Sequence, residues 1–349
     1  MNKTLEELYN EVAVEIARLD FDGLWQGFKP LKFALYNNEK CFFGGRYIEK
    51  PVEFCANTAL EFQGEQIAIW QMGDDLETPV LTSKIVHEMF HAFQLKEGWA
   101  CWANEMEALY KYHYDEENLT VKLYENRLLL ELLEQHDATK YEKLLAYKKY
   151  RQEKFPYEFS YECNAEEIEG TATYVEWQVL KQLDKNAADQ LLENMRNYLL
   201  QCKRFFPIRI LGYYTGALLV HGMLAAKDYS FKAENRPVVV QRLACVSSKD
   251  VLLDKADDDY KQVSQTVQLF NDEAKRVVET AIEKNDVVLT GPYELVCVNI
   301  YDAMHYQGYL TSRFFVMYLD NGEQKVINGN FVIKMQDDKT IDKVYRWEA

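Results

Sequence analysis

The sequence lacks the cysteine patterns that disulfide frameworks and thiolate metal sites require. Its seven cysteines are odd in number, lie far apart along 349 residues, and form no CxxC pair. Widely spaced cysteines are typical of reduced thiols, so a cytoplasmic location is expected. The seven positions are Cys41, Cys55, Cys101, Cys163, Cys202, Cys245 and Cys297.

Clustered positive charge is also missing. The chain has 40 Lys and Arg residues against 56 Asp and Glu, which gives a net charge of −16. A surface this acidic repels nucleic-acid phosphates and anionic lipids, so neither nucleic acid nor a membrane is an expected partner. The phosphate-binding loop with its lysine and the GxSxG nucleophile motif are absent as well.

Long hydrophobic runs are few. The most apolar stretch, residues 208–226, contains a histidine and three glycines, and it is too polar and short for a membrane span. The first twenty residues carry acids throughout, with apolar residues at helical spacing, so they predict an amphipathic helix rather than a secretion signal. Thr4 and Glu7 have the spacing of a capping box at the start of that helix.

The patterns that are present predict an α+β fold. Residues 30–73 are rich in aromatic and β-compatible residues and predict a small mixed or antiparallel sheet. Helical periodicity dominates residues 78–284. From residue 286 apolar and polar residues alternate, and DNGE at 320–323 signals a hairpin turn. We therefore expect a first domain at 1–285, with an N-terminal helix, a small sheet and a helical bundle, and an antiparallel β module at 286–349.

Residues 85–94, IVHEMFHAFQ, carry the pattern with the most chemical content. His87 and His91 are four positions apart, so on a helix they project from one face and can bind one ion. Glu88 points to the flank, where it can hold and deprotonate a water bound to that ion. The alternative is a buried helix whose histidines bond to carbonyls, but it would bury two imidazoles and a carboxylate at ligand spacing to no purpose.

A zinc ion held by two histidines needs a third protein ligand and an open position for water. No histidine follows closely, since the next are His113 and His136, so a glutamate is expected. Glu105 and Glu166 are alternatives. We favour Glu169, because Gly170 and the small residues after it would let that helix lie close beside the metal-binding helix.

VHEMFHAFQ together with EIEGTATYVEW resembles the gluzincin metallopeptidases of the thermolysin-like (MA) clan, which bind zinc through the motif histidines and a glutamate often followed by G-x-A. Over roughly residues 30–230 the chain is similar to poorly characterised bacterial members of that clan. The resemblance implies zinc on His87, His91 and Glu169, a zincin-like catalytic domain, and Glu88 as general base. It departs in spacing, since Glu169 follows His91 by 78 positions, and two long helices at 115–155 are then an insertion.

Hydrolysis also needs a group that stabilises the oxyanion. In gluzincins a tyrosine or histidine of a later helix has this role, and residues 208–226 predict a helix that offers several. Tyr214 and His221 are seven positions apart and share nearly one face. We predict Tyr214, with Tyr213 and His221 as alternatives, against the reading of a buried core tyrosine. Gly212 and Gly216 would let this helix approach a neighbour closely.

The leading hypothesis is a cytoplasmic zinc-dependent metallopeptidase in which Glu88 activates a zinc-bound water. Its expected partner is a peptide or protein substrate, and residues 56–60, ANTAL, are a candidate edge strand against which a peptide would pair. A zinc-dependent amidase or esterase acting on a small molecule is one alternative. A non-catalytic metal-binding interaction protein is the other, although such a protein has no need of Glu88.

Overall fold

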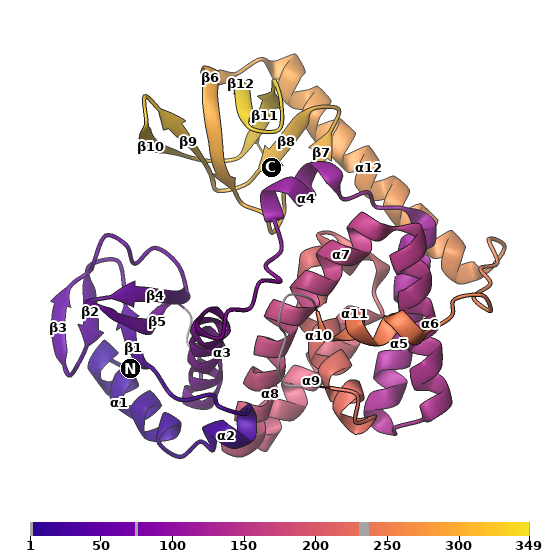
Figure 1. The fold of residues 1–349 in the computed structure, drawn as a ribbon. Helices are drawn as coiled ribbons and strands as arrows, with labels where there is room; N and C mark the ends of the chain where they lie inside the picture. The colour runs from indigo at the N-terminus through magenta and orange to yellow at the C-terminus, as the bar shows by residue number, and fades with distance from the viewer. Residues whose placement is uncertain (1–2, 74–75, 230–236, 349) are drawn as a thin grey trace.

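The computed structural model describes residues 3–73, 76–229 and 237–348. Its architecture is α+β, as predicted: a small mixed sheet, a mostly helical middle and a C-terminal antiparallel sheet (Figure 1). The first helix begins with the predicted capping box, in which Glu7 and Thr4 each accept a hydrogen bond from the other's amide. The elements of the N-terminal part are α1 (Leu5–Ile16), α2 (Phe21–Leu24), β1 (Lys32–Tyr36), β2 (Lys40–Phe43), β3 (Arg46–Glu49), β4 (Thr58–Phe62) and β5 (Glu65–Gln71).

The N-terminal sheet has the strand order β3-β2-β1-β5-β4. β1 and β5 run parallel and the other neighbours antiparallel, so the sheet is mixed. In the described structure β4 is an edge strand of this sheet, and it contains most of the ANTAL segment. α3 (Thr78–Lys96) packs against β4 and β5 on one side and the helical body on the other, because Ile85, Met89 and Phe90 are buried in the main core.

The helical body follows α3 and contains the two long helices predicted between 115 and 155. They are hinged at residues 135–137, as expected. The elements are α4 (Glu105–Lys111), α5 (Glu116–Glu134), α6 (Ala138–Lys154), α7 (Pro156–Ala165), η1 (Glu166–Gly170), α8 (Thr171–Leu183), α9 (Lys185–Leu199), η2 (Cys202–Phe205), α10 (Ile208–Ala225), α11 (Val238–Arg242), η3 (Leu243–Cys245) and α12 (Asp258–Lys284).

A π-helical turn, η1, interrupts the helix that carries the glutamates. This turn packs against α10 through glycines: a Cβ on Gly170 would lie 2.4 Å from the Cα of Gly216, and one on Gly216 would lie 2.4 Å from the carbonyl oxygen of Glu166. The expected close approach to α10 is therefore confirmed. α8, which begins after Gly170, does pack beside α3 as expected, but Gly170 itself meets α10 rather than α3.

α10 is also the most apolar helix. Among the described residues it is the one whose length and mean hydropathy would suit a membrane span, and 61% of it is buried inside the protein. All seven cysteines lie within the described residues and are unpaired, so no disulfide joins them.

The C-terminal β module is a seven-stranded antiparallel sheet with the order β10-β9-β6-β12-β11-β8-β7. The predicted hairpin joins β9 to β10, with positive φ at Asn321 and Gly322 as a type I′ turn requires. The boundary expected after residue 285 falls between α12 and β6. The strands are β6 (Val287–Val298), β7 (His305–Tyr306), β8 (Tyr309–Ser312), β9 (Phe315–Asp320), β10 (Glu323–Asn328), β11 (Phe331–Met335) and β12 (Thr340–Arg346).

Two helices attach this module to the helical body (Figure 1). The C-terminal end of α12 packs Val277 and Val278 against Val332 and Trp347 of the sheet. α4 packs Met106, Leu109 and Tyr110 against the apolar cluster of the sheet that contains Leu310, Val316 and Ile333. The β module is thus held to the body at two places.

Candidate metal centre

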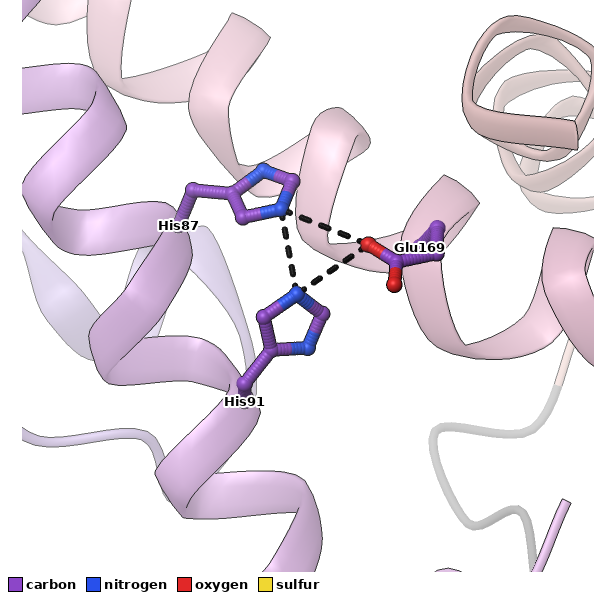
Figure 2. Close-up of side chains that lie close together, drawn as sticks. All are labelled: His87, His91 and Glu169. Carbon is purple, nitrogen blue, oxygen red and sulfur yellow. Dashed lines mark hydrogen bonds and ion pairs between the residues drawn. The ribbon is translucent and has the colours of Figure 1, made fainter. Parts of the chain in front are cut away.

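Three potential metal ligands converge between α3 and η1 (Figure 2). The Nε2 atoms of His87 and His91 lie 3.1 Å apart. Oε2 of Glu169 lies 3.2 Å from Nε2 of His91 and 3.7 Å from Nε2 of His87. A tetrahedral ion with bonds of about 2.0–2.2 Å separates its ligand atoms by about 3.3–3.6 Å. The spacing therefore suits one small cation.

The other nitrogen of each imidazole faces an acceptor. Nδ1 of His91 lies 2.8 Å from Oε1 of Gln94, whose own amide nitrogen donates to Ile168 O and Thr171 Oγ1. Nδ1 of His87 lies 3.2 Å from Oε2 of Glu176, a close contact rather than a well-aligned hydrogen bond. A proton on each Nδ1 would leave the lone pairs of both Nε2 atoms to face the centre.

Two imidazole lone pairs and a carboxylate oxygen thus meet where little water reaches, since His87 and Glu169 are only 7% and 9% exposed. Three acceptors at such distances repel one another unless a cation lies between them. A proton bound to His87 supplies part of this positive charge. Although burial lowers the pKa of His87, its contacts with Glu169 and Glu176 outweigh burial and raise the pKa to about 10. Burial raises the pKa of Glu169, but its contacts with His87 and His91 and the charge of Arg209 outweigh burial and hold that pKa well below its usual range.

Arg209 of α10 fixes the second oxygen of Glu169. Its Nη2 donates to Oε1 of Glu169 at 2.7 Å, which leaves Oε2 to the histidines. Its Nη1 donates to Glu105, and Glu105 also accepts from the Tyr161 hydroxyl at 2.6 Å. Glu105 is therefore occupied as the partner of Arg209 rather than turned towards the histidines.

Glu166 is occupied by a buried ion cluster that lies behind the centre. It accepts from Lys122 at 2.6 Å and from Lys148 at 2.8 Å. Burial raises its pKa, but the charges of those two lysines outweigh burial and hold the pKa well below the usual range. The cluster balances three cations against three anions, all at most 4% exposed: Lys122, Lys148, Arg151, Glu125, Glu162 and Glu166.

The converging ligands open into a cavity of about 470 Å³. Residues 57–59, at and just before the start of β4, form part of its wall, and Glu88 lines it beside the histidines. Burial raises the pKa of Glu88, although the neighbouring His87 and His91 oppose that shift. A carboxyl with a raised pKa in a cavity next to a cation site is suited to taking and returning a proton near neutral pH.

The structure distinguishes the tyrosines of α10. The ring of Tyr213 stacks over that of His87, with centroids 6.3 Å apart and planes 10° apart, and its hydroxyl lies 3.3 Å from Arg209 Nη2. Tyr214 also lines the cavity, but its ring packs on Tyr198. His221 packs against Trp177, with ring centroids 5.6 Å apart. Tyr213 is thus better placed than the predicted Tyr214 or His221.

Sequence reasoning missed several residues around the centre. Gln94 carries a local signal, because it lies three positions after His91 and so on the same face of α3. The role of Glu176 follows from its place two helical turns after Glu169. Trp102, in the segment directly after α3, and Tyr301, in the distant β module, also line the cavity, and neither was predicted. No family model, curated protein or solved structure matches the chain.

Proposed function

We propose that the chain is a zinc-dependent metallopeptidase of the gluzincin type, with zinc on His87, His91 and Glu169. The observation that carries the proposal is the convergence of two imidazole lone pairs and a carboxylate oxygen at ligand spacing, beside the free carboxylate of Glu88 in a cavity. Two histidines and one carboxylate, with a position left for water, are the ligand set of catalytic zinc sites.

When bound, zinc would lower the pKa of its water to about 7 and polarise the substrate carbonyl. Glu88 takes the proton of the attacking water and returns it to the leaving amine. The Tyr213 hydroxyl donates a hydrogen bond to the carbonyl oxygen as negative charge develops. Burial raises the pKa of Tyr213, so the hydroxyl keeps the proton that it donates. Gln94 holds the His91 imidazole in the tautomer that leaves Nε2 free, and Glu176 places a carboxylate beside Nδ1 of His87.

A peptide is favoured over a small-molecule amide or ester by the edge strand beside the cavity. In the described structure β4 pairs with β5 only, and residues 57–59 line the cavity next to the histidines. An extended peptide can add to such an edge through backbone hydrogen bonds, which a small ester cannot do. Glu88 argues against a purely structural metal site, which needs no base.

Elemental analysis of the purified protein tests the metal. We expect one zinc per chain in the wild type, and loss of that zinc in His87→Ala and in Glu169→Ala. Glu105→Ala and Glu166→Ala serve as tests of the alternative ligands. Wild-type protein purified without chelator and found free of zinc would contradict the proposal. If only Glu105→Ala lost its zinc, Glu105 rather than Glu169 would be the third ligand.

Glu88→Gln separates binding from chemistry. The amide keeps the size of the side chain but cannot take a proton, so we expect full zinc content and hydrolysis of peptides slower by about 10²–10⁴-fold. Peptide hydrolysis is measured beside a panel of small esters and amides. Turnover by Glu88→Gln at the wild-type rate would refute its role as base.

A further inference from the structure

A second cavity, of about 320 Å³, lies between the helical body and the β module. Its walls come from α4, the segment after α4, the start of α10, the middle of α12 and the loop before β7. Aromatic and aliphatic side chains of the lining, Tyr112, Tyr114, Tyr161, Ile208, Phe270 and Met304, stand beside polar ones, Glu105, His113, Asp115, Arg209, Asn271 and His305.

Three tyrosines of this cavity use their hydroxyls, whereas the buried hydroxyl of a fourth, Tyr110, has no hydrogen-bond partner among the described residues. Tyr112 donates to Glu162 at 2.7 Å and Tyr161 to Glu105 at 2.6 Å, while Tyr114 accepts from the Ile208 amide. Their rings therefore remain as the surface offered to a ligand. Arg209 and Glu105 of the lining form an ion pair with each other. The tyrosine rings and Phe270 therefore offer contact to an aromatic group, and the Tyr110 hydroxyl can bond a polar atom that such a group carries.

One side chain links this cavity to the metal centre. Arg209 lines both cavities, and its guanidinium contacts Glu169 on one side and Glu105 on the other. The side chain of Arg209 thus lies between the second cavity and Glu169, the proposed zinc ligand.

The β module contributes to both cavities through one short segment between β6 and β7. Tyr301, which is 51% exposed, lines the metal cavity. Its neighbours Ile300, Ala303 and Met304 line the second cavity. Because α4 packs into the core of the module, this segment is held in place against the helical body.

We propose that the second cavity is a substrate subsite that takes an aromatic side chain of a peptide near its scissile bond, and that the β module forms one of its walls. The inference rests on the proposed function. The volume is at the lower end of the range for ligand sites, about 300–1,000 Å³, which fits one large side chain rather than a cofactor. Aromatic rings pair favourably with the edges and faces of the tyrosines and Phe270.

Asn271→Trp tests the subsite, because Asn271 is an exposed residue of α12 that lines the cavity and an indole there would obstruct it. Gln265→Trp places the same ring on an exposed part of α12 away from the cavity and is the matched control. Both variants and the wild type are assayed on synthetic peptides that differ only in having Phe, Tyr, Leu, Ala or Asp beside the cleaved bond. Zinc content is measured in parallel.

We expect the wild type and Gln265→Trp to prefer Phe and Tyr peptides. In Asn271→Trp, kcat/KM for those peptides should fall about tenfold, mainly through KM, while the Ala peptide and the zinc content stay unchanged. Peptide cleavage without an aromatic preference, or an Asn271→Trp profile equal to that of the wild type, would overturn the subsite and leave the proposed function standing. A zinc-loaded wild type that cleaves no peptide would overturn both.

Discussion

Three glutamates in one π turn point to three different partners. Glu166 accepts from two buried lysines, Glu167 accepts from the Val238 amide at 3.0 Å, and Glu169 faces the histidines. Burial raises the pKa of Glu167 to about 7, whereas nearby positive groups lower the pKa of the other two despite their burial. Residues of the same type in one turn therefore differ in charge state because of what each one touches.

Arg209 is expected to set the metal affinity through Glu169. Arg209→Gln removes the donor that holds Oε1 of Glu169, so zinc affinity, measured by competition with a chelator, should fall about 10–100-fold. Arg209→Lys should recover part of it, because a single ammonium cannot bridge both glutamates as the guanidinium fork does. Arg204→Gln, an exposed arginine of η2, is the control. Wild-type zinc affinity in a folded Arg209→Gln protein would contradict this role.

Replacing each tyrosine by phenylalanine, which removes only the hydroxyl, distinguishes the role of Tyr213 from that of Tyr214. Tyr213→Phe should lower kcat by about 10²–10³-fold with little change in KM, because the hydroxyl acts on charge that develops only in the transition state. Tyr214→Phe should stay close to the wild type, since its ring packs on Tyr198. If Tyr214→Phe lowered kcat and Tyr213→Phe did not, Tyr214 would be the residue that stabilises the oxyanion, as the sequence pattern predicts.

At the scale of elements, the position of Glu169 depends on contact between η1 and α10. The two backbones meet directly at Gly170 and Gly216, while Gly212 lies against the small side chain of Ala165 at the end of α7. α10 in turn carries Arg209 and Tyr213, so the same contact that seats the proposed ligand also sets its distance from the residues that support it. The spacing of two glycines on α10 predicted a close approach, but the helix it approaches was visible only in the structure.

Gly216→Ala is expected to disturb that contact. The new methyl would lie 2.4 Å from the Glu166 carbonyl oxygen and 2.7 Å from the Gly170 Cα, so the π turn must shift. We expect a loss of about 1–3 kcal/mol in the free energy of unfolding, together with weaker zinc binding. Gly222→Ala on the same helix has no neighbour within 4 Å of its new methyl, so stability should rise by about 0.5–1 kcal/mol. Equal behaviour of the two variants would refute the argument.

The sequence predicts local geometry well and long-range geometry poorly. Helical periodicity alone places His87 and His91 on one face, and the alternation after residue 285 predicts the antiparallel sheet. The small residues after Glu169 favoured it as the third ligand, the resemblance to gluzincins implied the same residue, and the structure brings it beside the histidines. The contributions of Arg209 to both glutamates and of Tyr301 to the cavity depend on how α10 and the β module dock, and no short-range pattern encodes that docking.

At the scale of the whole molecule, the long helices α5 and α6 are fastened by buried charge rather than by apolar contacts alone. Lys122 and Glu125 come from α5, Lys148 and Arg151 from α6, and Glu162 from α7. The pattern is visible in the sequence only as charged residues among leucines. Such a cluster is stable only when every charge is matched, so loss of one member leaves an uncompensated charge in the core.

Glu166→Gln should therefore lower the free energy of unfolding by about 3–5 kcal/mol at pH 7. Because the folded-state pKa of Glu166 is depressed, its ionised form stabilises the protein fully above the unfolded-state pKa of about 4.3, and this contribution is lost as the pH falls below that value. The gap between variant and wild type should narrow from pH 7 to pH 3 in urea unfolding. Glu131→Gln, in an exposed pair with Lys140, should change stability by at most about 0.5 kcal/mol at either pH. A gap that does not depend on pH would contradict the assignment.

The distance along the chain between the histidine pair and Glu169 has a consequence for synthesis. A ribosome that adds about 5–20 residues per second needs roughly 4–16 s to make the 78 residues between His91 and Glu169, and longer to reach Arg209. During that time α3 can already form, with its histidines and without its carboxylate partner. The three proposed ligands can therefore come together only late in synthesis, after η1 and α10 have left the ribosome and packed against each other.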